Sequence, residues 1–244
     1  MQTPPVSGGF DPLLKGTIEM EKTKIAVIGY GGQGKWHCGQ LLKSDVAVLA
    51  GVYDIDPVKQ QQAKDAGIHT YASFEEVLGD KSVEAVTVVT PNDCHKELVI
   101  RALEAGKNVI CEKPVAMDLA ELDDMDRVCT QCGVSFTVHQ QRRFDPDFRT
   151  AKNVYDSGTL GDVYTIKSSL YGFNGNMHDW HVKISEGGGM LYDWGVHLLD
   201  QILWMLPGAK LKSVFADIRN VINEEVDDYF KILMRFDNGV TAEV

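Results

Sequence analysis

The sequence predicts an α/β domain built on a parallel sheet, followed by an α+β domain. Strand and helix patterns alternate from residue 24 to about residue 138, as they do when helices cover both faces of a parallel sheet. Residues 83–89 are a continuous apolar run suited to a central strand of such a sheet. Beyond Arg143 the regular alternation ends. We therefore expect three segments: a flexible tail (1–20), a first domain (21–140) and a second domain (141–244).

Capping and stop signals place the elements of the first domain. Asp56 and Pro57 supply an N-cap and a first-turn proline, and Ser73 and Glu76 have the spacing of a capping box. Asp118 and Glu121 again have N-cap and third-position spacing. Gly106 stops the preceding helix. The expected strands are 24–28, 46–53, 83–89, 108–111 and 134–138. The expected helices are 34–42, 56–66, a short one from 73, 93–105 and 118–133.

The second domain follows a different pattern. The expected elements are a helix at 147–155, a strand at 163–171, a helix at 188–204, and strands at 211–218 and 228–236. Asn238 and Gly239 form a strong hairpin-turn signal, yet only residues 240–244 follow to supply the returning strand. We therefore expect either that C-terminal sequence is missing or that a partner chain completes the sheet.

Composition excludes several classes of protein. The 24 basic and 35 acidic side chains give a formal net charge of −11 without any basic run, which argues against a nucleic-acid partner. No stretch approaches the roughly 20 apolar residues that a membrane-spanning helix needs, and the N-terminus lacks the pattern of an export signal. These features predict a soluble, cytoplasmic protein without membrane partners.

The cysteines fit a reducing compartment, because their number is odd and their spacing is irregular. They are Cys38, Cys94, Cys111, Cys129 and Cys132. The last two form a CxxC at the end of an expected helix, with no second pair to complete a metal site. We interpret this pair as structural, with redox activity as the alternative.

A glycine motif follows the first expected strand. Residues Gly29-Tyr30-Gly31-Gly32-Gln33-Gly34 satisfy GxGxxG at a strand-to-helix junction. In a Rossmann domain the first glycine permits the turn, the second lets the backbone approach a pyrophosphate, and the third allows close helix packing. Free N–H groups at the helix start attract the anion. The alternative is a glycine-rich turn without a ligand.

An acidic residue at the end of the second strand strengthens this interpretation. Asp54 lies 25 positions after Gly29, where a carboxylate can accept hydrogen bonds from the adenosine ribose. The same carboxylate repels a 2′-phosphate, and Ile55 and Asp56 offer no adjacent cation. We therefore expect NAD rather than NADP, with a simple turn aspartate as the alternative.

Two further places carry groups suited to catalysis. Glu112-Lys113-Pro114 follows the 108–111 strand, and open α/β sheets bind ligands beyond the carboxyl ends of their strands. Asp193 and His197 lie four apart on an expected helix, so that the carboxylate can orient the imidazole. A histidine near its ordinary pKa of about 6.5 can accept a hydroxyl proton. The plainer alternatives are an exposed lysine and a packed histidine.

Several ordered motifs resemble those of the Gfo/Idh/MocA oxidoreductases, which include glucose-fructose oxidoreductase and inositol dehydrogenases. These motifs span residues 24–204: GYGGQG, the turn of Thr90, Pro91 and Asn92 with His95 just after it, AGKNVICEKPVA, Arg143-Phe144, and GGGMLYDWGVHLLD. The resemblance implies a Rossmann domain followed by a domain with an open, mostly antiparallel sheet, which often forms the dimer contact. It also implies a homo-oligomer, a dimer or a tetramer, assembled through that sheet. Family members normally continue well past residue 244.

The resemblance further implies residue roles. Lys113 looks like the catalytic lysine, His197 like the catalytic histidine, and Asp193 like the acidic partner that holds the useful tautomer of His197. Hydride would move between the nicotinamide and a secondary alcohol while His197 takes the hydroxyl proton and Lys113 stabilises the oxygen. The remaining cofactor contacts implied are Thr90, Pro91, Asn92, His95 and Glu112.

A polar loop precedes the second glycine run and is a plausible wall for a polyhydroxylated substrate. The expected substrate contacts are Arg143, Tyr171, Asn176, His178, Asp179, Trp180 and His181. The alternatives are solvated loop residues or a metal site made of His178, His181, Asp193 and His197, although we expect no metal.

We therefore expect an enzyme that acts on a sugar, a cyclitol or a glycoside. The alternatives are a catalytically silent NAD-binding sensor or regulatory subunit, and a truncated product that binds NAD without forming the active oligomer. The presence of Lys113, Asp193 and His197 together argues against silence.

Overall fold

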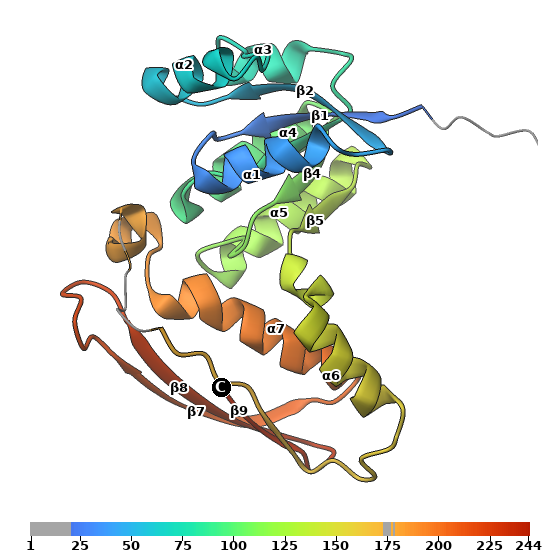
Figure 1. Ribbon diagram of the computed structural model, residues 1–244, viewed down its shortest axis with the longest axis vertical. Helices are drawn as coiled ribbons and strands as arrows, with labels where there is room; N and C mark the ends of the chain where they lie inside the picture. Colours follow the sequence, from blue (N-terminus) through green and yellow to red (C-terminus); the bar gives the residue numbers. More distant parts are fainter. Residues whose placement is uncertain (1–20, 173–176, 178) are drawn as a thin grey trace, which may run out of the picture.

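The computed structural model describes residues 21–172, 177 and 179–244. It contains a five-stranded sheet in the N-terminal part and a four-stranded sheet in the C-terminal part (Figure 1). This arrangement confirms the predicted parallel α/β unit followed by an α+β unit. The tail expected over residues 1–20 lies outside the described residues.

The first sheet is parallel throughout, as predicted. Its strands run in the order β2-β1-β3-β4-β5, so the chain reverses its direction of travel across the sheet between β1 and β3. Ligands of open α/β sheets bind at such a reversal. The strands are β1 (Thr23–Ile28), β2 (Ala47–Tyr53), β3 (Ala85–Val88), β4 (Asn108–Cys111) and β5 (Phe136–Val138).

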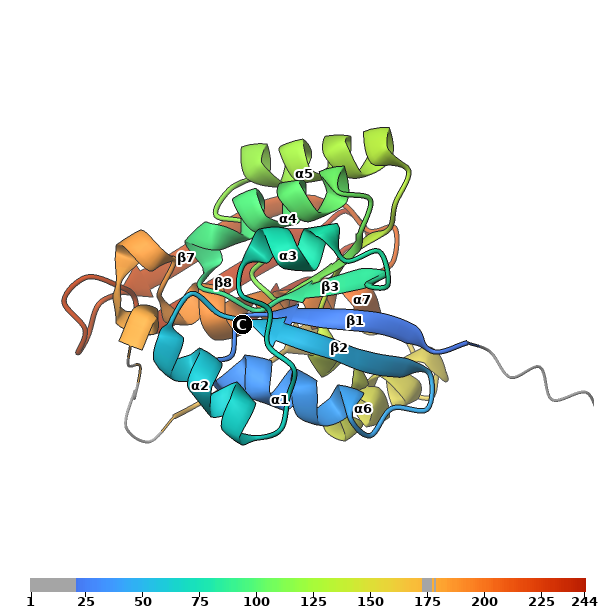
Figure 2. The same ribbon diagram turned by 90° about the horizontal axis from the view of Figure 1, so that it is seen from above.

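Helices cover both faces of this sheet. Figure 2 shows α1 and α2 on one face and α3, α4 and α5 on the other. The larger apolar core lies on the second side, where Val86, Leu103 and Met125 are fully buried. The helices are α1 (Gly32–Leu41), α2 (Pro57–Asp65), α3 (Phe74–Gly79), α4 (His95–Glu104) and α5 (Leu119–Cys132).

The predicted caps form as expected. The side chains of Asp56, Ser73 and Asp118 each accept a hydrogen bond from a backbone N–H in the first turn of the helix that follows. The main differences are at the ends of elements. Helix α1 begins at Gly32 rather than Gly34, because the glycine motif supplies its own first turn, and the apolar run predicted as strand 83–89 pairs only over Ala85–Val88.

The second sheet runs in the order β6-β9-β8-β7. Strands β7, β8 and β9 are antiparallel, whereas β6 pairs in parallel with β9. Helices α6 and α7 lie on the side of this sheet that faces the first unit (Figure 1). The elements are α6 (Pro146–Asp156), β6 (Thr165–Lys167), α7 (Val196–Met205), β7 (Leu211–Arg219), β8 (Tyr229–Phe236) and β9 (Thr241–Glu243).

Two predictions for this unit were wrong in length. The strand predicted over 163–171 is only three residues long, because its partner β9 is equally short. The helix predicted over 188–204 begins at Met190 and opens with a π-helical turn, Leu191–Gly195, before α7. The N–H groups of Met190 and Leu191 at its start donate to Asp227.

Strands β7 and β8 carry exposed apolar side chains. Phe215 of β7 is paired with Leu233 of β8 on one face of the sheet, whereas Val214 and Ile218 of β7 point to the other face. None of the helices in the described ranges combines the length and apolarity needed to cross a membrane.

The glycine turn depends on close backbone packing, which predicts a sharp contrast between two substitutions in α1. A Cβ atom at Gly34 would lie 2.1 Å from the carbonyl oxygen of Gly29, whereas a Cβ at Gly39 would meet nothing within 4 Å. We expect Gly34→Ala to lower the free energy of unfolding by about 1–3 kcal/mol. We expect Gly39→Ala to raise it by about 0.5–1 kcal/mol. Urea denaturation of both variants measures this contrast, and equal stabilities would refute the packing argument.

Candidate active site

A cavity of about 1000 Å³ lies beyond the carboxyl ends of the parallel strands. The turns that follow β1, β2, β3 and β4 line it from the first unit. Residues 179–181 and the segment around Asp193 and His197 line it from the second unit. The cavity is therefore at the position where the strand order predicts a ligand.

Most of the predicted cofactor residues line this cavity: Gly29, Gly31, Gly32, Gln33, Asp54, Thr90, Pro91, Asn92, Glu112 and Lys113. Tyr30, Gly34 and His95 do not. Tyr30 contributes a backbone N–H to Asp54, and Gly34 packs its helix against the turn. Both act on the shape of the turn rather than on the cavity surface.

The glycine turn fits the pyrophosphate of a dinucleotide. Gly31 is the N-cap of α1 and has no side chain to cap the first-turn N–H groups. A Cβ at Gly31 or Gly32 would meet nothing within 4 Å, so the backbone here faces open space. An uncapped helix N-terminus that lines a cavity attracts an anion through its free N–H groups and the helix dipole.

Asp54 is buried at the end of β2, where it stabilises the turns around it. Its Oδ2 atom accepts a hydrogen bond of 2.6 Å from the Tyr30 N–H, and Oδ1 accepts one of 2.8 Å from the Asp56 N–H. Lys59 Nζ lies 3.9 Å from Oδ2 and also lines the cavity. No cation was expected beside Asp54, because its sequence neighbours are Ile55 and Asp56, and the position of Lys59 in the first turn of α2 was not predicted.

Two other cavity residues near the sheet reversal escaped prediction. The Arg101 guanidinium lies 4.8 Å from the centroid of the Phe74 ring, and both residues line the cavity. A flat arginine–aromatic pair of this kind can stack on an adenine ring. Phe74 follows the predicted cap residue Ser73, but nothing in its local pattern distinguishes it from a core phenylalanine.

His95 has a supporting position behind the cavity. It is fully buried, and its two ring nitrogens lie 2.9 Å from the Pro114 carbonyl oxygen and 3.1 Å from that of Thr90. Burial lowers the pKa of His95. The prediction of a cofactor contact at His95 therefore needs correction, because the ring joins two cavity turns and lies behind them.

Lys113 and Asp193 form an ion pair across the two units. Lys113 Nζ donates to the Asp193 carboxylate Oδ1 at 2.7 Å and to the Asp193 backbone carbonyl oxygen at 2.7 Å. Both side chains are largely buried, with exposed fractions of 14% and 24%. Asn92 adds a second link, since its amide donates to the Gly187 carbonyl oxygen at 2.7 Å.

His197 has a different partner from the one predicted. Its Nδ1 atom lies 3.2 Å from Gln140 Oε1, which can only accept, so Nδ1 carries the proton and Nε2 is free to accept one. Burial lowers the pKa of His197 to about 4, with smaller contributions from Lys113 and Arg142. The predicted orientation of His197 by Asp193 is therefore wrong. Gln140 has this role, and the Asp193 carboxylate is bound to Lys113.

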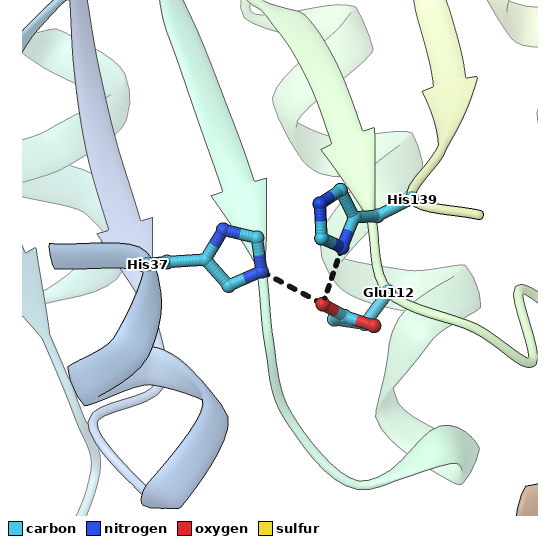
Figure 3. A group of neighbouring side chains, drawn as sticks. All are labelled: His37, Glu112 and His139. Atoms are coloured by element: carbon cyan, nitrogen blue, oxygen red, sulfur yellow. Dashed lines mark hydrogen bonds and ion pairs between the residues drawn. The ribbon is translucent and has the colours of Figure 1, made fainter. Parts of the chain in front are cut away.

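Glu112 lines the cavity but points toward two histidines (Figure 3). Its Oε1 atom lies 2.7 Å from His37 Nε2 and 2.8 Å from His139 Nδ1. Burial alone would raise the pKa of the Glu112 carboxyl. The hydrogen bonds from His139 and His37 outweigh burial and hold this pKa below its ordinary value.

The predicted substrate residues separate into three groups. Asp179, Trp180 and His181 line the cavity. Arg143 instead forms an ion pair with Asp200 beside a second, smaller cavity, and Tyr171 is almost fully exposed. The remaining two, Asn176 and His178, lie outside the described residues.

Three cavity residues close to the predicted ones were missed. Gln141, Arg142 and Trp194 line the cavity, and the Arg142 guanidinium lies 4.1 Å from the centroid of the Trp194 ring. The Gln141 Oε1 and Arg142 Nε atoms are buried without a protein partner. These polar atoms and the indole ring suit a ligand that carries several hydroxyl groups.

The alternative metal site of the sequence analysis does not assemble from its described members. His181, Asp193 and His197 do not form a group of ligand distance among the residues that the structure describes. The cysteines are free, and in the CxxC pair Cys129 is half-buried with its thiol donating to the Val134 carbonyl oxygen, while Cys132 is exposed.

Comparison with known proteins agrees with this geometry. The family model described as the oxidoreductase family with an NAD-binding Rossmann fold (GFO_IDH_MocA) matches residues 23–140. The model of the GFO/IDH/MocA C-terminal domain matches residues 148–244.

Individual relatives cover most of this chain. The scyllo-inositol 2-dehydrogenase (NADP(+)) IolW of Bacillus subtilis is 31% identical over 92% of this chain, which spans 63% of that enzyme's length. An NAD-binding protein from Listeria innocua has a TM-score of 0.88 and 42% identity over 91% of this chain and 66% of its own. GenD2 from gentamicin A biosynthesis, solved in complex with NAD, has a TM-score of 0.82 and 27% identity over 96% of this chain and 68% of its own. The chain therefore belongs to the Gfo/Idh/MocA oxidoreductase family.

Proposed function

We propose that this protein is an NAD(P)-dependent oxidoreductase that acts on a secondary alcohol of a sugar, a cyclitol or a glycoside. The observation that carries the proposal is the composition of one cavity. Its wall contains an uncapped glycine turn, the acidic residue Asp54, and the group of Lys113, Asp193 and His197. Cofactor-binding and proton-transferring groups thus share one space, as hydride transfer requires.

The chain's own residues would manage the proton and the charge. A nicotinamide bound in the cavity would supply the hydride acceptor or donor. His197 would accept the hydroxyl proton at Nε2, because Gln140 fixes the proton of the free imidazole on Nδ1. Lys113 would hold the substrate oxygen and stabilise negative charge as it develops there, while Asp193 keeps the ammonium group in place.

We favour NAD as the cofactor, because the buried Asp54 carboxylate would repel a 2′-phosphate. The Lys59 ammonium, whose Nζ atom lies 3.9 Å from Asp54 Oδ2, offsets part of this repulsion. The relatives include enzymes named for NADP and a protein solved with NAD, so the choice rests on the charges at this position.

A homo-oligomer, a dimer or a tetramer, is part of the proposal. Strand β7 is an edge of its sheet, and its apolar side chains Val214, Phe215 and Ile218 are exposed. Phe215 lies opposite the exposed Leu233 of β8. Exposed apolar side chains at a sheet edge favour a protein–protein contact.

The first test is turnover. We expect reduction of the nicotinamide, followed by its absorbance, with at least one member of a panel of inositols, sugars and glycosides. Lys113→Ala and His197→Ala should each lower kcat/KM by about 10²–10⁴-fold, because each removes a group that acts in the transition state. Cofactor binding by calorimetry should survive both changes. Cofactor binding without any turnover in the unchanged chain would instead favour a silent NAD-binding sensor.

The pH dependence tests the role of His197. Since its pKa is lowered to about 4, the residue stays neutral and able to accept a proton above that pH. We expect kcat/KM to fall only as pH drops through about 4, rather than through the ordinary value of about 6.5. Gln140→Glu places a carboxylate beside the imidazole and should move this acidic limb upward by about one unit. An acidic limb near 6.5 in the unchanged enzyme, or no movement in the variant, would contradict the assignment.

Cofactor choice tests the charges beside the ribose position. Asp54→Ala should weaken NAD binding by about tenfold or more, since a buried ribose partner is lost. Lys59→Gln removes the nearby cation and should weaken NADP binding more than NAD binding. Lys64→Gln, at the other end of α2, serves as the control and should change neither affinity. A preference for NADP that survives Lys59→Gln would show that other residues select the cofactor.

A further inference from the structure

The cluster around Glu112 is assembled from three separate elements of the first unit. His37 comes from α1, Glu112 follows β4 and His139 follows β5 (Figure 3). Parallel strands end at the same edge of a sheet, and the start of α1 lies at that edge too. Residues 37, 112 and 139 are thereby brought together from distant parts of the chain.

The three side chains converge on one point. His37 Nε2 and His139 Nδ1 lie 2.7 Å and 2.8 Å from the same oxygen, Glu112 Oε1. The two imidazole centroids are 4.6 Å apart. The Trp36 ring lies 5.2 Å from the His37 ring and 5.9 Å from the His139 ring, and so packs against both.

The cluster is held in place before any ligand arrives. His37 and Glu112 are buried, and the His139 side chain is 23% exposed. Oε1 also receives a hydrogen bond of 3.1 Å from Gln33 Nε2, and Oε2 receives one of 3.2 Å from the Lys113 N–H. Because the rotamers are already restricted, a ligand shared by these groups would pay little ordering entropy.

The catalytic proposal above does not use the two imidazoles, and the geometry points to a divalent transition-metal site formed by His37, Glu112 and His139. The ligand atoms of these three residues all lie within 4.8 Å of one another. Two imidazole nitrogens and one carboxylate oxygen suit Zn²⁺, Co²⁺ or Fe²⁺, whereas Mg²⁺ and Ca²⁺ prefer oxygen ligands alone.

The required movement is small. Metal bonds of about 2.0–2.2 Å in tetrahedral geometry place neighbouring ligand atoms about 3.4 Å apart. The present separations of 2.7 Å and 2.8 Å would therefore each open by about 0.6 Å. Each neutral imidazole would bind through the nitrogen that now faces Glu112, and its proton would move to the other ring nitrogen, so no net proton is lost.

The site would keep an open position toward the cavity. Glu112 and Gln33 both line the cavity wall. Rotation of the Gln33 amide would bring its oxygen to the place where its nitrogen now bonds Glu112, which offers a fourth ligand, and a water molecule from the cavity is the other choice. The cation would thus lie in the wall of the cofactor cavity rather than within the space of the substrate.

Cobalt is the probe of choice, because Co²⁺ bound by nitrogen and oxygen ligands absorbs in the visible range. The full chain, treated with a chelator and desalted, would be titrated with CoCl₂ at pH 7.5. We expect the visible absorbance to saturate at one equivalent of Co²⁺. The cobalt bands should disappear when ZnCl₂ is added, because Zn²⁺ displaces Co²⁺. His139→Gln should weaken Co²⁺ binding by at least about a hundredfold, since it removes a direct ligand. Calorimetric titration with Zn²⁺ compares the metal affinities of the unchanged chain and of His139→Gln without relying on a spectrum.

Control variants separate this cluster from other metal-binding groups. His69→Gln changes an exposed histidine elsewhere, and Cys132→Ser removes the exposed thiol, and both should bind Co²⁺ as the unchanged chain does. Should His139→Gln fail to fold by circular dichroism, Glu112→Gln and His37→Gln report on the same site. The proposal is overturned if the unchanged chain shows no saturable Co²⁺ binding, or if binding persists in folded variants of the cluster.

Discussion

The ion pair between Lys113 and Asp193 is the contact on which the arrangement of the cavity depends. It joins the end of β4 to the π-helical turn of the second unit, with a charged side chain contributed from each side. Removing either side chain by substitution would leave the other charge largely buried and unpaired, at a cost of several kcal/mol. Together with the hydrogen bond from Asn92 to Gly187, this pair fixes how the two units share one cavity.

The fold of the first unit was predictable because its signals are local. Strand and helix periodicity and the caps at Asp56, Ser73 and Asp118 depend on neighbours along the chain, and each formed as expected. The errors occur where distant contacts decide the backbone. Asp227 binds the N–H groups at the start of the predicted 188–204 helix, and the length of β9 limits β6. No pattern within either segment could reveal those partners.

The residue types of the candidate site were predictable from the sequence, but the directions in which their side chains point were not. Lys113, Asp193 and His197 do line one cavity, yet the pairing among them differs from the expected one, because Gln140 comes from a turn far away in sequence. Arg143 was predicted to contact the substrate, whereas its neighbour Arg142 lines the cavity. Successive residues of a 3₁₀ turn point about 120° apart, so an error of one position can turn a side chain away from the cavity.

At the end of β4, two neighbouring side chains likewise point in different directions and contact different groups. Successive side chains of an extended segment point to opposite sides. Glu112 therefore turns to His37 and His139, while Lys113 turns to Asp193. Two opposite charges, adjacent in sequence, are thus each paired with other groups, and neither neutralises the other. This separation leaves Lys113 with a carboxylate that holds its ammonium beside His197 in the cavity, and it leaves the Glu112 carboxylate for the histidine cluster in the wall.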